Sequence, residues 1–232
     1  MRLAKRFLDV GLFTNNLEPM LSFWQGEIGL PFEEALPTGG GTVQHRHGLN
    51  GGVLKINHSR EPLPESPPSG YRELLIARPA LRQPASLVDP DGNRVTLVPP
   101  GERGVSSLAV VIHVSSLDHA RRYYRDALGM AELAPGTLRI GESLWFLQED
   151  PEARPAASMR GQGYRYLTVQ VWDCDAECAG IAARGGVVAM APRTMGAVAR
   201  FGFVRDPDGN MLEISQRASL TGPLPPDTLP EE

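Results

Sequence analysis

The sequence predicts an α+β protein built from tandem βαβββ units, and two repeats predict it. The first repeat is Asp-Pro-Asp-Gly-Asn, which occupies residues 89–93 and again 206–210 of the 232-residue chain. Asp opens a type I turn, Pro fixes the second position and Gly accepts a left-handed backbone, so each copy predicts a tight turn before a short strand. The second repeat is the strand and helix pattern of residues 7–30, which returns one hundred positions later.

The first unit begins with an alternating strand at residues 7–14. Its two faces carry, respectively, Leu8, Val10 and Leu12, and Asp9, Gly11 and Phe13. A helix follows over 17–28, where apolar residues recur at helical spacing and Gly29 ends the helix. Strands then follow, separated by glycine-containing turns, at 32–36, 42–47 and 52–57.

The second unit, at residues 70–98, has lost its helix. Its start, Gly-Tyr-Arg-Glu-Leu at 70–74, corresponds to Gly-Tyr-Arg-Tyr-Leu at 163–167, and both copies run on to the Asp-Pro-Asp-Gly-Asn turn. The earlier copy is 24 residues shorter, and in the later copy these residues hold a predicted helix at 175–184 and a strand near 187–189. Two prolines, Pro79 and Pro84, argue against a replacement helix in the shorter copy.

Four units therefore follow one another along the chain, at about 7–58, 70–98, 106–149 and 163–216. A Pro-Pro-Gly seam at 99–101 predicts two domains, residues 1–100 with the first two units and 101–217 with the last two. Residues 218–232 are rich in Pro and acidic side chains and predict a tail, either packed on the surface or disordered.

Composition excludes several classes of partner. The chain has 23 basic and 27 acidic residues, for a net charge of -4, and it contains no basic run or stripe, so nucleic acid is not an expected partner. No apolar run approaches the roughly 20 residues that span a bilayer, and the first ten residues carry charges where a signal peptide is apolar, so we expect a cytoplasmic protein without a membrane partner. The two cysteines, Cys174 and Cys178, are read as ordinary reduced thiols rather than half of a metal site.

The paired units, the helix ends Ile28-Gly29-Leu30 and Leu128-Gly129-Met130, and the repeated turn together resemble the vicinal oxygen chelate superfamily. Its members include glyoxalase I, bleomycin-resistance proteins, fosfomycin-resistance transferases and extradiol dioxygenases. The resemblance implies that two units pair into a curled mixed sheet, or cup, flanked by helices, and that metal ligands project into it from the first and last strands of the units. Because this fold hosts several chemistries, function has to be argued from the site.

Strand alternation predicts which side chains face the cups, because the strongly apolar face of each first strand belongs under the helix. From the first to the fourth unit, the cup residues are Asp9, Gly11, Phe13 and Lys55; Glu73 and Thr96; Ala109, Val111, His113 and either Trp145 or Phe146; and Tyr166, Thr168, Gln170 and Glu213.

The resemblance implies His or Glu at the ligand positions, and only Glu213 matches outright. Asp9 and Glu73 are chemically able ligands, whereas Ala109, Thr96 and Tyr166 depart from the pattern. The implied metal site is therefore degenerate, with Glu213, Asp9 and His113 as candidate ligands for either one divalent ion (Fe, Zn, Mn or Ni) or none.

Lys55 offers an alternative to the metal, because a fixed ammonium near carboxylates neutralises them and repels a divalent ion. Its other interpretation is a lysine whose stem lies along the sheet while its head reaches water. Two further candidates, His45 and His47, share one face of a strand and could present two imidazoles to a metal or lie on an exposed edge.

Tyr166 and Glu213 are the candidate catalytic pair. They either form a plain hydrogen bond or act as acid and base in proton transfer next to a carbonyl. The other residues expected to line a ligand pocket are Phe13, Lys55, Glu73, Thr96, His113, Trp145 and Gln170.

Two questions remain open in the sequence. The first unit pairs either with the second, as in dioxygenases, or with the fourth, as in fused glyoxalases. The function is either that of a glyoxalase-like or dioxygenase-like enzyme (a metal-dependent lyase, isomerase or dioxygenase) acting on a small, partly apolar molecule with vicinal oxygens, or that of a non-catalytic binder of the bleomycin-resistance type. Either protein would have a small-molecule ligand and would be a monomer or a homodimer.

Overall fold

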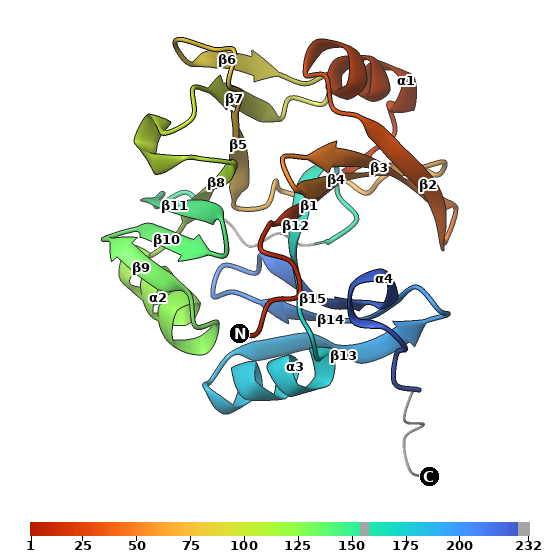
Figure 1. Cartoon of the computed structure of the whole chain (residues 1–232), viewed down its shortest axis with the longest axis vertical. Helices are drawn as coiled ribbons and strands as arrows, with labels where there is room; N and C mark the ends of the chain where they lie inside the picture. Colours follow the sequence, from red (N-terminus) through yellow and green to blue (C-terminus); the bar gives the residue numbers. More distant parts are fainter. Residues whose placement is uncertain (154–157, 227–232) are drawn as a thin grey trace.

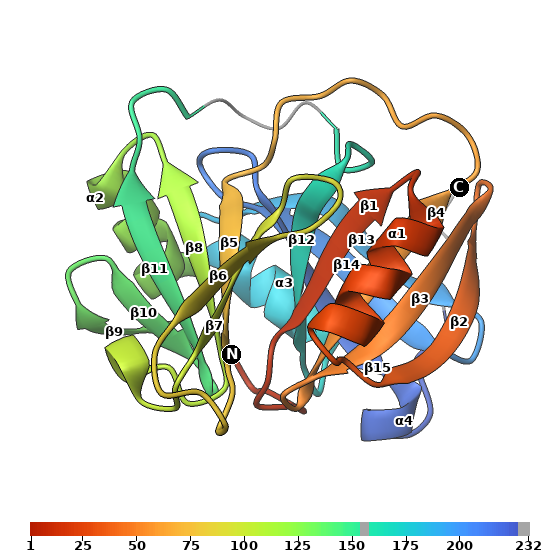
Figure 2. The same cartoon turned by 90° about the horizontal axis from the view of Figure 1, so that it is seen from above.

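The computed structural model describes residues 1–153 and 158–226, which form two curled mixed sheets with helices on their outer sides (Figures 1 and 2). The first sheet has the order β13-β14-β15-β12-β1-β4-β3-β2, and the second has the order β6-β7-β5-β8-β11-β10-β9. The α+β fold of repeated units predicted from the sequence is confirmed.

The strands of the first sheet are β1 (Asp9–Thr14), β2 (Phe32–Gly39), β3 (Thr42–Leu49), β4 (Gly52–Ser59), β12 (Gly163–Gln170), β13 (Val187–Met195), β14 (Ala199–Arg205) and β15 (Met211–Arg217). Those of the second sheet are β5 (Tyr71–Ala77), β6 (Ala85–Val88), β7 (Arg94–Val98), β8 (Leu108–Val114), β9 (Ala131–Ala134), β10 (Thr137–Ile140) and β11 (Ser143–Glu149). The helical segments are α1 (Leu17–Leu21) with the π turn η1 (Ser22–Glu27), the 3-10 turn η2 (Glu102–Gly104), α2 (Leu117–Arg122) with the π turn η3 (Tyr123–Ala127), α3 (Cys174–Ala183) and α4 (Ala218–Thr221).

The first unit pairs with the fourth, and the second pairs with the third. Antiparallel β1 and β12 bring Asp9 opposite Thr168, and antiparallel β5 and β8 bring Leu75 opposite Ala109. Each sheet therefore takes one unit from each half of the chain, as the colours of Figure 1 show. The division at residue 100 does not coincide with the division into sheets, and it stays a prediction about the sequence repeat.

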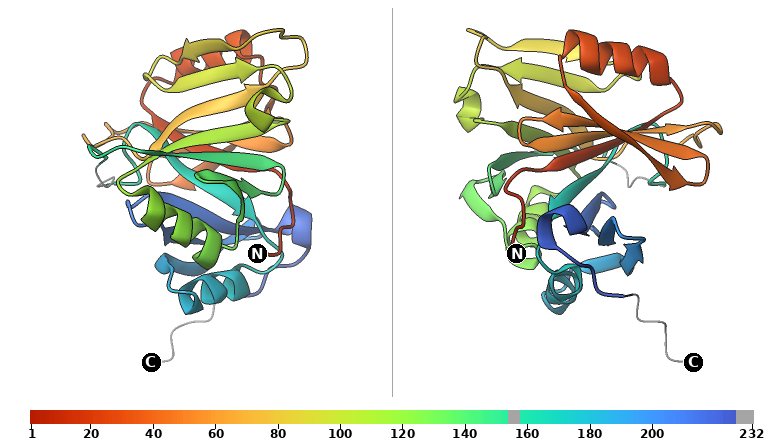
Figure 3. Two further views of the ribbon diagram at one scale, coloured as in Figure 1. Left: turned by 90° about the vertical axis from the view of Figure 1, so that its left-hand side faces the viewer. Right: turned by 45° about the vertical axis from the view of Figure 1, so that its right-hand side comes forward.

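The helices lie where the sequence predicts them, and their absence from the second unit follows from its length. Asp173 begins α3 by accepting a hydrogen bond from the backbone of Ala176, as an N-cap carboxylate does. Between β5 and β6 the described chain makes only a turn, at residues 78–84. Figure 3 shows α1 at one end of the molecule and α2 and α3 together at the other. Among the described residues no helix is long and apolar enough to cross a membrane.

One continuous apolar cluster joins both sheets with the helices. The predicted apolar face of β1 (Leu8, Val10 and Leu12) lies in this cluster and is at most 2 % exposed. Because side chains alternate along a strand, Asp9, Gly11 and Phe13 point to the opposite, concave side. The same alternation applies to β4, β8, β12 and β15, so each sheet has a concave face that is free to form a cup.

The repeated turns brace the two sheets against each other. In each turn the first Asp accepts the backbone N–H groups of the third and fifth residues, and the Asn side chain donates back to that Asp. The free amide oxygens then cross between the sheets: Asn93 accepts from the backbone of Tyr164 at 3.3 Å, and Asn210 accepts from the backbone of Gly70 at 2.6 Å. The motif is therefore structural in both copies.

Candidate functional site

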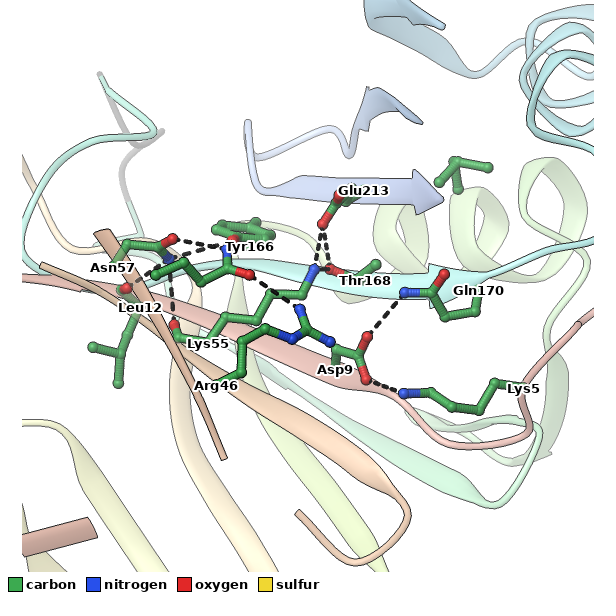
Figure 4. Close-up of polar contacts among 12 residues, drawn as sticks. Lys5, Asp9, Leu12, Arg46, Lys55, Asn57, Tyr166, Thr168, Gln170 and Glu213 are labelled. Atoms are coloured by element: carbon green, nitrogen blue, oxygen red, sulfur yellow. Dashed lines mark hydrogen bonds and ion pairs between the residues drawn. The ribbon is translucent and has the colours of Figure 1, made fainter. Parts of the chain in front are cut away.

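The concave face of the first sheet encloses a cavity of about 480 Å3. Five of the predicted site residues line it, namely Phe13, Lys55, Tyr166, Gln170 and Glu213. Asp9 lies beside them and is bonded to Gln170. Figure 4 shows the side chains of Asp9, Lys55, Tyr166, Gln170 and Glu213 converging from β1, β4, β12 and β15, the four strands at the centre of the sheet. The pairing of the first and fourth units thus brings together residues from opposite ends of the chain.

Lys55 lies at the centre of the group (Figure 4). Its ammonium donates to Glu213 Oε2 at 2.7 Å and to Thr168 Oγ1 at 2.7 Å, and Thr168 donates to the same Glu213 oxygen at 2.6 Å. The Lys55 and Glu213 side chains are only 5 % and 12 % exposed. The ammonium also lies 5.3 Å from the ring centroid of Tyr166, within the range of a cation–π contact. The first cup therefore holds a fixed, buried cation.

Asp9 is fully buried and held as a carboxylate. It forms an ion pair with Lys5, and Gln170 Nε2 donates to its other oxygen at 3.0 Å. Burial has the largest effect and would raise the pKa of Asp9, but the charges of Lys5 and Lys55 and the hydrogen bonds from Lys5 and Gln170 together outweigh it and hold the pKa below 3.8. The Oε1 atom of Gln170 is buried and accepts no hydrogen bond from the described residues, so it is an unused acceptor in the cup.

Tyr166 receives two hydrogen bonds, from Asn57 Nδ2 at 3.2 Å and from Gln44 Nε2 at 3.3 Å. The orientation of both amides is fixed from outside. Arg46, which can only donate, bonds Gln44 Oε1, and the carbonyl of Leu12, which can only accept, bonds Asn57 Nδ2. Since the phenol oxygen already accepts twice, its own proton is available to a ligand. Burial, followed by the charge of Glu213, raises the pKa of Tyr166 far above its ordinary value, so this group is a hydrogen-bond donor.

The predicted hydrogen bond between Tyr166 and Glu213 is not formed. The described structure has no hydrogen bond between them, because Lys55 and Thr168 take the carboxylate and the two amides take the phenol. Gly11 makes room for this arrangement, since a Cβ atom at that position would overlap the Tyr166 ring. The ring then packs edge-on against Phe203, at a centroid distance of 5.7 Å.

The rest of the lining is cationic and apolar. Among the described residues that line the cavity, one is a carboxylate, Glu213, and five are cations, Arg46, Lys55, Arg160, Arg193 and Arg217. Arg46 and Arg217 share the rim carboxylate of Glu34, at 3.1 and 2.8 Å. The apolar part centres on Phe13, Tyr166 and Phe203. The cup is thus suited to a small molecule that is partly apolar and carries oxygen atoms.

The comparisons with known proteins agree with this architecture. Residues 106–214 match the family model Glyoxalase/Bleomycin resistance protein/Dioxygenase superfamily. Glyoxalase I from Zea mays superposes with a TM-score of 0.71 at 14 % identity, over 93 % of this chain and 92 % of that one. The matches support the resemblance to the vicinal oxygen chelate superfamily, through the family model over residues 106–214 and through the fold over most of the chain.

Two further relatives are similar in different ways. A probable lactoylglutathione lyase of Vibrio cholerae is 29 % identical over 122 residues, which are 47 % of this chain and 88 % of that protein. A putative dioxygenase from Bacillus subtilis has a TM-score of 0.68 at 13 % identity, over 94 % of this chain and 85 % of that one. The two solved structures establish the fold alone.

The residues of the first cup that correspond to the metal-binding positions implied by the resemblance do not fit a divalent ion. Lys55 occupies the β4 position itself, and Asp9 and Glu213, on β1 and β15, already bind ammonium groups. The described residues contain no group of three His, Cys, Asp or Glu side chains that could hold a metal. The tentative set of Glu213, Asp9 and His113 is also wrong in its geometry, because β8 and β15 belong to different sheets.

The second cup, on the concave face of the seven-stranded sheet, contains the remaining predicted site residues. Glu73 and Thr96 meet there, with the Thr hydroxyl donating at 2.5 Å, and His113 bonds Asp150 at 3.0 Å. The floor of this cup is filled by a buried apolar cluster of Leu75, Ala77, Val98, Val105, Ala109, Val111, Leu144 and Phe146.

Trp145 does not wall this cup. It is fully buried on the helix side of β11, with its ring 5.1 Å from that of Tyr124, and its neighbour Phe146 faces the cup. The segment Leu144 to Leu147 is apolar on both faces, so it contains no signal for the direction of either ring.

Sequence reasoning missed Gln44 and Arg46, which face the first cup from β3. Their neighbours His45 and His47 point to the other side, where Gln25 bonds His47 at 2.9 Å, so the two histidines do not enter the cup. This strand is polar on both faces, so alternation alone could not orient it. Asn57 lies two residues after Lys55 on β4 and could have been found by the same alternation that placed Lys55.

Proposed function

We propose that the first cup binds a small, partly apolar molecule with vicinal oxygens and that Lys55 takes the place of the metal ion. The observation that carries this proposal is the Lys55 ammonium, 2.7 Å from both Glu213 and Thr168. An ammonium cannot bring two oxygens into one coordination sphere, but it can donate hydrogen bonds to them and offset negative charge on them. The Tyr166 hydroxyl is a second donor, and Gln170 Oε1 is an acceptor for a ligand hydroxyl.

The activity that this arrangement supports best is proton transfer next to a carbonyl group. Glu213 is the base: both of its bonds go to Oε2, and Oε1 accepts no hydrogen bond from the described residues. It takes a proton from the carbon beside the carbonyl, and the electron pair of that C–H bond moves toward the carbonyl oxygen. Lys55 and Tyr166 donate to the resulting enolate oxygen. In an α-hydroxy-ketone the proton of the neighbouring hydroxyl then moves to the enolate oxygen, and Glu213 returns the abstracted proton to the former carbonyl carbon. The carbonyl group thereby shifts to the adjacent carbon, and atoms and charge balance.

The alternative is a binder without catalysis. It is favoured by the bond between Lys55 and Glu213, because a carboxylate that already accepts from an ammonium is less available as a base. The apolar cluster of Phe13, Tyr166 and Phe203 would then supply the affinity, as buried aromatic surface does in ligand pockets.

Deuterium exchange separates the two functions. The protein is incubated in D2O with a panel of vicinal dicarbonyl and α-hydroxy-ketone compounds. Lactoylglutathione is included because of the Vibrio relative. Proton NMR follows the signal of the hydrogen on the carbon next to the carbonyl. We expect exchange that survives EDTA and disappears in Glu213→Gln. Line broadening of a ligand without exchange, unchanged in Glu213→Gln, identifies a binder.

A matched control comes from the second cup, where Glu73→Gln should leave both signals unchanged. Exchange that is lost in EDTA and restored by Zn²⁺ or Ni²⁺ would overturn the role given to Lys55. Tight binding of one divalent ion by the wild-type protein, abolished by Asp9→Ala, would overturn it as well.

A further inference from the structure

The second cup contains a pocket that the first cup's function leaves unexplained. It measures about 780 Å3 and lies between β5, β8, β11, the first Asp-Pro-Asp-Gly-Asn turn and the start of β12. The apolar cluster that includes Val105 and Phe146 fills the floor of this cup, so the pocket occupies only its outer part. Its lining contains Arg72, Glu73, His113 and Asp150.

Arg72 enters this pocket because of a bulge in β5. Tyr71 pairs with Ile112 and Glu73 with Val111, which leaves Arg72 as the extra residue. A bulge bends the strand and re-aims the side chain of the extra residue. The fourth unit has the same irregularity in β12, where the residue between Tyr164 and Tyr166 is Arg165. The two arginines thus hold equivalent positions in the two copies of the repeat.

The guanidinium of Arg165, on the first sheet, has several hydrogen-bond acceptors within the protein. Its side chain is buried, and it donates to the carbonyls of Gly161 at 2.7 Å, Gln162 at 3.0 Å and Pro67 at 2.8 Å. These bonds tie the loop before β12 to the segment before β5. In this copy the bulge arginine is a structural clamp, and all its acceptors belong to the protein.

Arg72 has no such acceptors. Within the described chain its guanidinium makes no hydrogen bond or ion pair, and its Nε atom is buried from solvent without a partner. A buried donor without an acceptor costs roughly 1–3 kcal/mol. Three carboxylates line the same pocket, and none of them accepts a hydrogen bond from Arg72: Thr96 bonds Glu73, His113 bonds Asp150, and Asn16 bonds one oxygen of Asp91. Among the described residues, the Arg72 guanidinium therefore has no hydrogen-bond acceptor, and its N–H groups are available to a ligand.

We propose that this pocket binds the oxyanion of a small molecule, a carboxylate or a phosphate, with Arg72 as its principal donor. The guanidinium presents its N–H groups in a planar fork that matches either oxyanion in a bidentate manner. His113 and Arg94, which line the same pocket, add donors at its edge. This site does not depend on the function of the first cup, because the two pockets have no lining residue in common.

Titration of the full chain with inorganic phosphate and, separately, with acetate tests the proposal by NMR. The readouts are the Nε–H signal of Arg72 and the backbone amides of residues 71–73 and 113. We expect saturable shifts with at least one of the anions, and the anion with the lower dissociation constant identifies the chemistry of the ligand. In Arg72→Gln the dissociation constant should rise at least about tenfold.

Two controls keep the result specific. Lys55→Gln in the first cup should leave the shifts around Arg72 unchanged, which separates this site from anion binding by the Lys55 ammonium. Arg72→Lys, which keeps the charge and loses the fork, should bind with intermediate affinity. The proposal is overturned if neither anion shifts these signals at about 10 mM, or if the shifts persist unchanged in Arg72→Gln.

Discussion

Replacing Lys55 with Met removes the buried ammonium from the first cup and leaves Glu213 without its ionic partner. The Lys55 and Glu213 side chains are 5 % and 12 % exposed, so the remaining charge has little access to water. Removing one partner of a buried pair typically costs about 3–5 kcal/mol. Because Thr168 still donates to Glu213 and the carboxylate is not fully buried, we expect about 3 kcal/mol, the lower end of that range. Urea denaturation at pH 7 measures the free energy of unfolding.

The double variant Lys55→Met with Glu213→Gln is the matched control. It removes both charges, so it should recover most of the lost stability, since the desolvation cost disappears together with the attraction. A single variant within about 0.5 kcal/mol of the wild type, as for an ordinary surface change, would refute the reasoning, and so would a double variant as unstable as the single one.

Three further substitutions test other parts of the site. Gly11→Ala should lower the free energy of unfolding by about 1–3 kcal/mol, because its Cβ would overlap the Tyr166 ring. Thermal unfolding measures this loss, and the double variant with Tyr166→Leu should recover part of it. Arg165→Gln should cost about 3 kcal/mol because its carbonyl acceptors lose a charged donor. Arg72→Gln removes a buried donor without a partner, so it should not lower the free energy of unfolding; equal losses in urea would contradict the difference between the two copies. Asp9→Asn should cost about 2 kcal/mol at pH 7. Since the pKa of Asp9 is lowered in the folded protein, its stabilisation is present above pH 3.8 and is lost as the pH falls through the lowered value, so the difference from the wild type should shrink below pH 3.8. A deficit that stays constant down to pH 3 would show that Asp9 acts by shape rather than by charge.

Much of the fold could be predicted because the repeats fix the units and alternation fixes the faces. In β1 the apolar residues Leu8, Val10 and Leu12 share one parity, so Asp9 and Phe13 had to face the cup. The missing helix of the second unit follows from a segment too short to contain it. These patterns are local in the sequence, and because the units repeat, each pattern is seen twice in the same chain.

The arrangement of the site could not be predicted because it depends on contacts between distant units. Nothing in the local pattern of β1 says whether its neighbour is β5 or β12, and only the second choice brings Lys55 to Glu213. Faces also stay undetermined where a strand is uniformly apolar, as around Trp145, or uniformly polar, as around Arg46. The bulges in β5 and β12 left no sign of their own in the sequence, although they decide where two arginines point.

The pairing of the first unit with the fourth has a consequence for how the protein folds. The second cup is made from a continuous stretch of chain, because Leu75 meets Ala109 across a short connection. The first cup has to bring Asp9 to Thr168, and the entropy lost in closing a loop grows with its length. Long-range strand pairing is also slow. We therefore expect the second cup to form first and to serve as the scaffold on which the ends of the chain meet. The candidate site with Lys55 and Glu213 is then the last part of the molecule to assemble and the first to open under denaturing stress.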